Sequence, residues 1–323
     1  MNPDVAGAVE RLRRQGVLSA EAAAAVLPVA RGERVSIHAE LRTLLYGGVL
    51  LVTAGVGVLV RENLDRIGPV AVAVGLGLAA LLCLAWLARV GPDFAPGEVA
   101  SPRLAFDYVL LLGVLLAAAD LAYVEVQFTT LGPQWPTHFL LVAALAGALA
   151  FRYDSRALFS LALASIAAWR GVTVSLDALR LALPGGAPEV LRGNALACGA
   201  VFILIGILLA RGSLKKHFEP VATHLGAILM LGGMLSGCGM DTGPELAWTL
   251  SLLLASLTLG LVAARTRRFS LFVLGTLGAY AAFLVLVVRT RMDEKPLLLL
   301  LAVSALLLLV GLVRARRLIR ESA

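Results

Sequence analysis

The third long apolar run of the sequence, residues 106–126, carries an ionisable side chain at Asp120. In a helix of about 3.6 residues per turn, Tyr123 and Gln127 fall within about 60° of Asp120, so the three residues form one polar stripe. A charge inside hydrocarbon costs at least about 2.5 to 3.5 kcal/mol, so such a residue is the first candidate for a function. The stripe predicts a proton or cation site, or an acid that orients a polar substrate from the outer side.

A structural role for Asp120 is the competing interpretation. In that case the carboxylate would accept a hydrogen bond or form an ion pair between helices, and one acid alone specifies no chemistry. Arg170, beside Trp169 at the outer end of the fifth run, is the basic residue that we expect to pair with it. Asp107 and Glu125 lie on another face and mark the two ends of the helix, where acids are easily solvated.

His224, Asp241 and Glu245 form a secondary set near the ends of later apolar runs. His224 could shuttle protons or bind a metal, but no other histidine lies on its helix, so we favour a packing role. Asp241 and Glu245 belong to a predicted outer rim that also holds Trp248. Interfacial tryptophans are common there without any ligand.

Compact catalytic motifs are absent from the sequence, including those for nucleotide hydrolysis, dinucleotide binding, zinc proteases and serine hydrolases. Cys83, Cys198 and Cys238 share no close spacing, which favours neither a disulfide framework nor a zinc site. We therefore predict no catalytic residue, no metal and no cofactor, and we favour a protein that is not an enzyme.

The elements that must position these residues are helices in lipid. The chain is 59% hydrophobic and 15% charged, and its long apolar runs predict an all-α, polytopic transmembrane helical bundle. Most runs reach the roughly 20 residues that cross a bilayer. The fourth and fifth are short enough to be tilted or re-entrant, so we predict ten spans, or eight without these two. The runs are residues 41–60, 69–87, 106–126, 136–151, 157–171, 192–210, 218–237, 245–264, 269–288 and 296–313.

The distribution of Lys and Arg predicts the orientation. With the amino terminus inside, 20 of the 28 basic residues fall on inner segments and 8 on outer segments, so both termini are expected in the cytoplasm of a bacterial inner membrane. The net charge of +7 lies in short clusters at the ends of apolar runs. This placement favours membrane lipids as partners and argues against nucleic acid.

Residues 1–40 predict a cytosolic helical hairpin, whose first helix stops at Gly16 and whose second starts at an N-cap on Ser19. No cleaved signal peptide is visible in this segment. The transmembrane domain is expected over 41–317, with a tail at 318–323. Between the fifth and sixth spans, residues 173–183 look amphipathic and could lie along the outer interface.

The amino-terminal segment resembles a bacterial family of predicted membrane proteins that is classified only as a domain of unknown function. The resembling residues run from Arg11 to Glu21 and from Tyr46 to Gly57, a glycine-rich first span, and end at the sequence Glu-Asn-Leu-Asp of residues 62–65. Leu64 stands where the family has Trp. The resemblance implies a bacterial membrane protein with a cytosolic helical prefix, and it implies no activity, substrate or catalytic residue.

Three functions remain open from the sequence. The first is a transporter or permease for a small solute or a lipid-like molecule, which ten spans, a five-plus-five organisation and Asp120 would fit. The second is a membrane scaffold or regulator that docks a protein partner through its cytosolic hairpin. The third is a membrane-embedded enzyme acting on lipid-linked substrates, which would need distant rim residues to converge.

Overall fold

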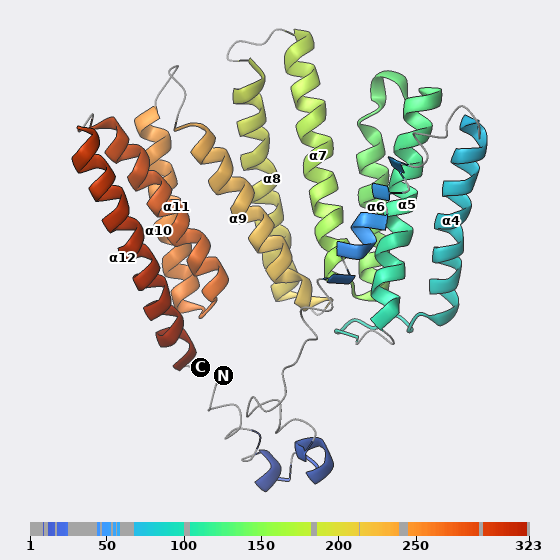
Figure 1. Ribbon diagram of the computed structural model, residues 1–323, viewed down its shortest axis with the longest axis horizontal. Helices are drawn as coiled ribbons and strands as arrows, with labels where there is room; N and C mark the ends of the chain where they lie inside the picture. Colours follow the sequence, from blue (N-terminus) through green and yellow to red (C-terminus); the bar gives the residue numbers. More distant parts are fainter. Residues whose placement is uncertain are drawn as a thin grey trace. The chain divides into compact units, whose positions relative to one another are not determined.

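The structure of the protein is a computed structural model, shown as a ribbon in Figure 1. The chain divides into two compact units, Met1–Gly68 and Pro69–Ala323. The domain boundaries expected at residues 40 and 317 stay predictions. The described residues are 9, 12–16, 18–24, 44–45, 47–52, 54–55, 57–58, 68–99, 104–181, 186–212, 214–238, 245–290 and 293–321.

Helices make up all the regular structure of the described residues, which confirms the predicted all-α class. Apolar segments become helices because a backbone in lipid must satisfy its own N–H and C=O groups. Two short 3₁₀ turns, η1 Gly132–Gln134 and η2 Lys216–Phe218, precede α6 and α9. The helices of the second unit are α4 Pro69–Val90, α5 Leu104–Phe128, α6 Thr137–Tyr153, α7 Arg156–Leu181, α8 Gly186–Arg211, α9 Glu219–Ser236, α10 Glu245–Arg265, α11 Phe269–Arg289 and α12 Glu294–Glu321.

Seven of the described helices, namely α4, α5 and α8 to α12, are long and apolar enough to cross a membrane. Helix α6 is apolar but has 17 residues, and α7 is not among the seven. These two helices are the fourth and fifth runs, which the sequence also marks as the weakest. Of the first predicted span, the described positions between residues 44 and 58 are helical.

Helix α7 corrects the prediction that the fifth span ends at Gly171 and that residues 173–183 form a separate segment. One continuous helix runs from Arg156 to Leu181. A glycine inside a helix costs only about 1 kcal/mol relative to alanine, so Gly171 does not end it. A Cβ atom at Gly171 would lie 3.6 Å from the side chain of Leu191 in α8, which places this glycine at a helix contact.

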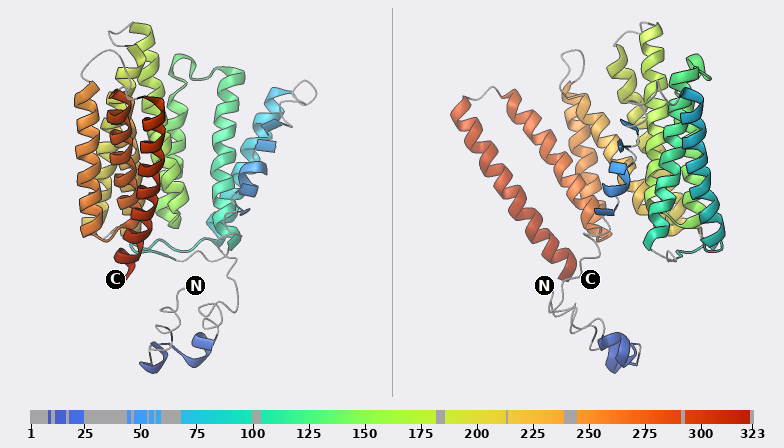
Figure 2. Two further views of the ribbon diagram at one scale, coloured as in Figure 1. Left: turned by 60° about the vertical axis from the view of Figure 1, so that its left-hand side comes forward. Right: turned by 45° about the vertical axis from the view of Figure 1, so that its right-hand side comes forward.

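Consecutive helices of the second unit pack as up-and-down hairpins, which Figure 1 and the turned views of Figure 2 show. Helix α4 packs on α5, α6 on α7, α8 on α9, and α10 on α11. Helix α9 also contacts α7, α10 and α11, and it is both the most buried and the least hydrophobic of the seven spans. This combination is expected of a helix that faces protein more than lipid.

Helices α8 and α9 approach each other most closely at glycines. A Cβ atom on Gly226 of α9 would lie 2.7 Å from the carbonyl oxygen of Gly199 in α8. A Cβ atom on Gly199 would lie 2.9 Å from the backbone nitrogen of Met230. Small residues at such points let the two backbones approach closely, as in many membrane bundles. Helices α10 and α11 meet in the same way, where a Cβ on Gly275 would lie 2.7 Å from the nitrogen of Gly260.

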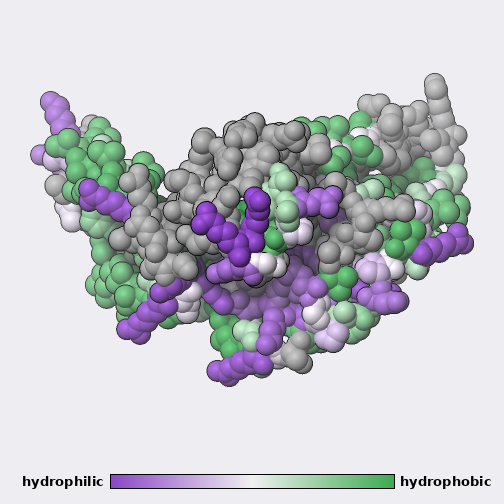
Figure 3. Space-filling view, turned by 90° about the horizontal axis from the view of Figure 1, so that it is seen from below, coloured by the Kyte–Doolittle hydropathy of each residue, from purple (hydrophilic) through white to green (hydrophobic). Residues whose placement is uncertain are grey.

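An aromatic core lies near the end of the second unit that carries the α4–α5, α6–α7 and α8–α9 loops. The Phe159 and Phe218 rings stack with their centroids 4.7 Å apart, and Phe106 meets Tyr153 edge-on at 5.4 Å. Phe106 and Phe218 are almost completely buried. Seen towards this end, hydrophobic residues cover much of the flanks, and hydrophilic residues gather in patches between them (Figure 3).

The unit Met1–Gly68 contains the helix stop and the helix start that the sequence predicts. Gly16 has a φ of 73°, in the left-handed region that glycine adopts without strain. The Leu18 N–H donates to the Leu12 carbonyl at 3.2 Å. The Ser19 hydroxyl oxygen accepts from the Ala22 N–H at 3.1 Å, so Ser19 is the expected N-cap.

Candidate functional site

Asp120 lies on α5 where this helix packs against α4. Gly77 of α4 faces it, since a Cβ atom at Gly77 would come within 3.1 Å of Asp120 Oδ2. The missing side chain at Gly77 therefore leaves the room that the carboxyl group occupies. The other oxygen, Oδ1, is buried, and no described residue hydrogen-bonds to it.

Tyr123 adds a second unsatisfied polar atom one helical turn further along α5. Its hydroxyl group is also buried, without a hydrogen-bond partner in the part of the chain that the structure describes. Gln127, the third residue of the stripe, is exposed near the end of α5. Most buried polar groups in native proteins are hydrogen-bonded, so two exceptions on one helix face call for a functional explanation.

Arg170 does not pair with Asp120. Its guanidinium group lies over the ring of Trp169, with 5.8 Å between Cζ and the ring centroid. Asp120 Oδ1 has no partner in the described part of the chain. The physical reason is the packing order, since α7 packs against α6, α8 and α9, whereas Asp120 faces α4. The candidate site is therefore Asp120 with Tyr123, against Gly77.

Glu125 shows how a structural acid on the same helix is satisfied. The sequence favours a solvated position for it at the helix end, but Glu125 is buried, with 8% of its surface exposed. Its Oε2 accepts from the backbone N–H of Leu131 at 2.7 Å and from the Thr130 hydroxyl at 3.0 Å. Glu125 therefore orders the loop that follows α5, and its partners explain its burial.

His224 links α9 to α11. Its Nδ1 lies 2.5 Å from the Pro220 carbonyl oxygen and its Nε2 lies 2.7 Å from the Ser270 hydroxyl. A carbonyl oxygen only accepts, so Nδ1 carries the proton, and in the neutral ring the Ser270 hydroxyl donates to Nε2. This geometry is that of a packing histidine. Asp241 lies outside the described residues, and so does the side chain of Glu245.

A buried charged cluster, which the sequence reasoning missed, lies between the α4–α5, α6–α7 and α8–α9 loops. Lys215 Nζ lies 2.7 Å from Asp154 Oδ1, and the two side chains are 0% and 3% exposed. His217 Nε2 lies 3.0 Å from the same oxygen. The other Asp154 oxygen, Oδ2, accepts from the Val99 N–H at 3.0 Å. We call Asp154, Lys215 and His217 the loop cluster.

The backbone around the loop cluster completes the connection between the loops. The Lys215 N–H donates to the Pro96 carbonyl at 2.8 Å, and Lys215 Nζ lies 4.9 Å from the centroid of the Phe94 ring. Both Asp154 and Lys215 have positive φ angles, 59° and 49°. Since protein groups surround these charges, the cluster fixes three loops and offers no open position for a reactant. An acid in the short, otherwise basic segment from Arg152 to Arg156 is the sequence signal that could have found it.

The described residues contain no evident metal-binding site. No group of three or more His, Cys, Asp and Glu side chains there could hold a metal ion. Cys83, Cys198 and Cys238 are free thiols, of which the last two are buried. Outside the loop cluster, an ion pair between Arg268 and Glu219 joins the starts of α11 and α9.

Comparison with known proteins finds a match to a protein family but none to an individual curated protein or solved structure. No curated protein matches the chain. No solved structure matches it either. A family match does cover the part of the chain that holds Gly77, Asp120 and Tyr123, and it extends well beyond the first seventy residues. Residues 10–159 match the family described as "Predicted membrane protein (DUF2157)", which confirms the resemblance seen in the amino-terminal residues.

Proposed function

We propose that this integral membrane protein is a permease for a small solute or a lipid-like molecule, and that Asp120 carries a proton or a cation during transport. The proposal rests on the buried Oδ1 atom of Asp120, which has no hydrogen-bond partner among the described residues and lies on a helix that is long and apolar enough to span a membrane. An isolated carboxylate in hydrocarbon is costly. The group is therefore held as the neutral acid or with a bound cation, and exchange between such forms is what ion coupling requires.

The other buried acids of the described residues differ from Asp120, because each of them has a structural partner. Glu125 accepts two hydrogen bonds, Asp154 pairs with Lys215, and Glu219 pairs with Arg268. Each of them is explained by a structural contact. Asp120 has a buried Oδ1 atom and no such contact in the described part of the chain. Intramembrane acids without a structural partner are typical of ion and substrate pathways.

The packing of α4 supports movement next to Asp120. Of the seven spans, only α12 is less buried than α4, of which 17% is buried. A helix with few buried contacts can shift at a low free-energy cost, and Gly77 presents no side chain to obstruct the carboxyl group. A shift of α4 against α5 would open and close access to Asp120.

The orientation that we propose has both termini in the cytoplasm, in the cytoplasmic membrane of a bacterium. The excess of Lys and Arg on the segments assigned to the inside supports it. Asp120 then lies in the outer half of α5, and the loop cluster lies on the cytoplasmic side. The ion would reach Asp120 from outside.

Proton movement in proteoliposomes tests the proposal. Purified protein is reconstituted into vesicles that contain a pH-sensitive dye, and a cell extract of small metabolites is added outside under an imposed potassium diffusion potential. We expect the extract to acidify the vesicle lumen with the wild-type protein. Asp120→Asn should abolish the signal, because the amide cannot release a proton.

Asp107→Asn is the matched control, since it removes an acid from the other end of the same helix. It should retain the signal of the wild type. Size-exclusion profiles of both variants establish that they are folded. Retained acidification with Asp120→Asn would contradict the role of Asp120. No acidification with the wild type in any extract fraction would exclude a proton as the coupled ion, and the same assay with a sodium-sensitive dye then tests the cation.

A second candidate function is a regulator that binds a protein partner through residues 1–40. The turn between Gly16 and Ser19 favours it, because this turn defines two helix ends in the first unit, ahead of the first predicted span. Deletion of residues 1–38 distinguishes the two functions. Loss of a co-purifying partner with proton movement unchanged supports the regulator, and unchanged partners contradict it.

A further inference from the structure

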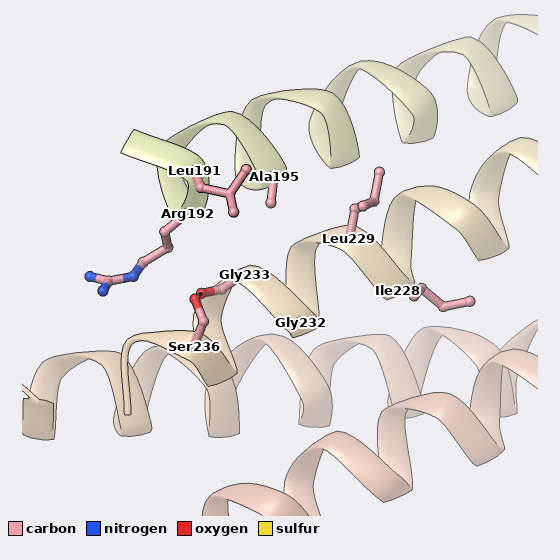
Figure 4. A pocket seen from close by; sticks show the side chains of 8 residues that line it. All are labelled: Leu191, Arg192, Ala195, Ile228, Leu229, Gly232, Gly233 and Ser236. Carbon is pink, nitrogen blue, oxygen red and sulfur yellow. Dashed lines mark hydrogen bonds between the residues drawn. The ribbon is translucent and has the colours of Figure 1, made fainter. Parts of the chain in front are cut away.

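An apolar groove lies between α8 and α9, beyond the point where Gly199 and Gly226 bring these helices together. It has a volume of about 420 Å³. In Figure 4 the Arg192 guanidinium extends at one end of the groove, and Leu229 and Ile228 lie at the other. The lining residues are Leu191, Arg192, Ala195, Ile228, Leu229, Gly232, Gly233 and Ser236.

The groove is lined by one charged side chain, that of Arg192, and otherwise mostly by apolar residues. Ser236 is the only other polar side chain, and its hydroxyl already donates to the Gly233 carbonyl at 2.7 Å. Leu191 and Ile228 are 44% and 50% exposed, so the groove is open, and we expect these apolar side chains to face lipid. A matching ligand is amphipathic, with an alkyl chain and an anionic head.

Arg192 lies where it could meet such a head group. The residue is only 8% exposed, and its guanidinium carbon lies 5.1 Å from the centroid of the Trp248 ring. Stacking on an aromatic ring uses the face of a guanidinium, whereas phosphate oxygens accept hydrogen bonds from the N–H groups at its edge. Arg192 also lies near the start of α8 and of its apolar span, and basic residues at the ends of spans are suited to contact lipid head groups.

We infer that this groove binds one acidic phospholipid, with an acyl chain between α8 and α9 and the phosphate at Arg192. Charge complementarity selects the acidic head group, and the apolar length selects the acyl chain. The site is independent of the proposed transport function, since it lies on different helices from Asp120. A measurement of lipid binding alone therefore tests it.

Native mass spectrometry of the delipidated full chain tests the inference. The protein is titrated in detergent with dioleoyl phosphatidylglycerol, with dioleoyl phosphatidylcholine, and with the first lipid in the presence of inorganic phosphate. We expect one phosphatidylglycerol to bind more tightly than phosphatidylcholine. Millimolar inorganic phosphate should not displace it, because the acyl chain holds the lipid in the groove.

Two variants with matched controls locate the lipid. Arg192→Gln should weaken phosphatidylglycerol binding on the order of tenfold, since a charge-assisted contact is lost. Arg211→Gln, at the other end of α8, should not. Gly232→Leu should block binding by filling the groove, because a Cβ atom there meets nothing within 4 Å. Gly193→Leu, at an equally open and exposed glycine outside the groove, should leave binding unchanged.

The results separate the inference from its alternatives. Equal effects of Arg192→Gln and Arg211→Gln, or of the two leucine variants, would overturn the site. Equal binding of the two lipids would overturn the acidic selectivity. Displacement by inorganic phosphate would assign Arg192 to a free anion. Arg192→Lys keeps the charge and gives a folded comparison if Arg192→Gln does not fold.

Discussion

Two ion pairs at the same end of the second unit differ strongly in their exposure to solvent. Lys215 and Asp154 are 0% and 3% exposed, whereas Arg156 and Glu98, paired at 2.8 Å, are 56% and 61% exposed. Removing one partner of a buried pair leaves a charge that cannot be solvated. Removing one partner of an exposed pair leaves a charge in water.

Asp154→Asn should therefore lower the free energy of unfolding by about 3 to 5 kcal/mol, because Lys215 remains buried without its counter-charge. Asparagine tolerates the left-handed backbone of this position, so the change isolates the charge. Unfolding in detergent measures the loss. Arg156→Gln should cost at most about 1 kcal/mol, and equal losses in the two variants would contradict the assignment.

Tyr123 permits a second prediction at the residue scale. Because its buried hydroxyl has no hydrogen-bond partner in the described ranges, Tyr123→Phe should remove an unsatisfied polar atom without breaking a hydrogen bond. The free energy of unfolding should stay the same or rise by about 1 kcal/mol. The same unfolding measurement applies, with Tyr280→Phe as control, which loses the contact with the Ser304 hydroxyl at 3.1 Å and should destabilise. A clear loss of stability in Tyr123→Phe would show that the hydroxyl has a partner.

At the scale of elements, two glycines of α9 have opposite surroundings. Gly226 faces α8 at backbone distance, whereas Gly232 has open space where a side chain would begin. Hydropathy treats both positions alike, so the sequence cannot separate a contact glycine from an open one. The distinction depends on how α8 crosses α9.

Gly226→Ala should lower the stability of the protein by about 1 to 3 kcal/mol, because its methyl group has no room against Gly199 and Ile203. Gly232→Ala should be neutral or stabilising, since it gains helix propensity and meets nothing. Thermal unfolding of the two single variants in the same detergent compares them. If both alanines had the same effect, the close approach of the helices would be wrong.

Helix positions were predictable where the apolar runs are long, and contacts were not. The second, third and sixth to tenth runs correspond to α4, α5 and α8 to α12, since length and hydropathy alone define them. Asp120 and Tyr123 were found because a polar stripe in a span is visible from spacing. Lys215 was missed because its partners Asp154 and Pro96 lie on two other loops. The end of α7 was missed because Gly171 resembles a boundary.

At the scale of the molecule, the topology depends on α6 and α7. If both cross the membrane, the loop before α6 and the turn after it lie on opposite sides. If neither crosses, the two positions lie on the same side. The side of every other loop is the same in both arrangements, so one pair of labels decides between ten and eight spans.

Cysteine labelling supplies that pair. In a variant whose three native cysteines are replaced by alanine, Gln134→Cys should react with a membrane-impermeant maleimide in intact cells. Arg156→Cys should react only after permeabilisation. Both side chains are exposed, so access depends on the side of the membrane. Labelling of both positions from outside would contradict the predicted crossing of α6.

The packing of each helix on its neighbour in the chain also bears on how the protein is made. Most contacts of the second unit join α4 to α5, α6 to α7, α8 to α9, and α10 to α11. A ribosome delivers these partners one after the other, and local contacts form fastest. Each hairpin can therefore close in the bilayer before the next one is synthesised. Helix α12, which packs chiefly on α11, would then be added last, to a bundle already assembled.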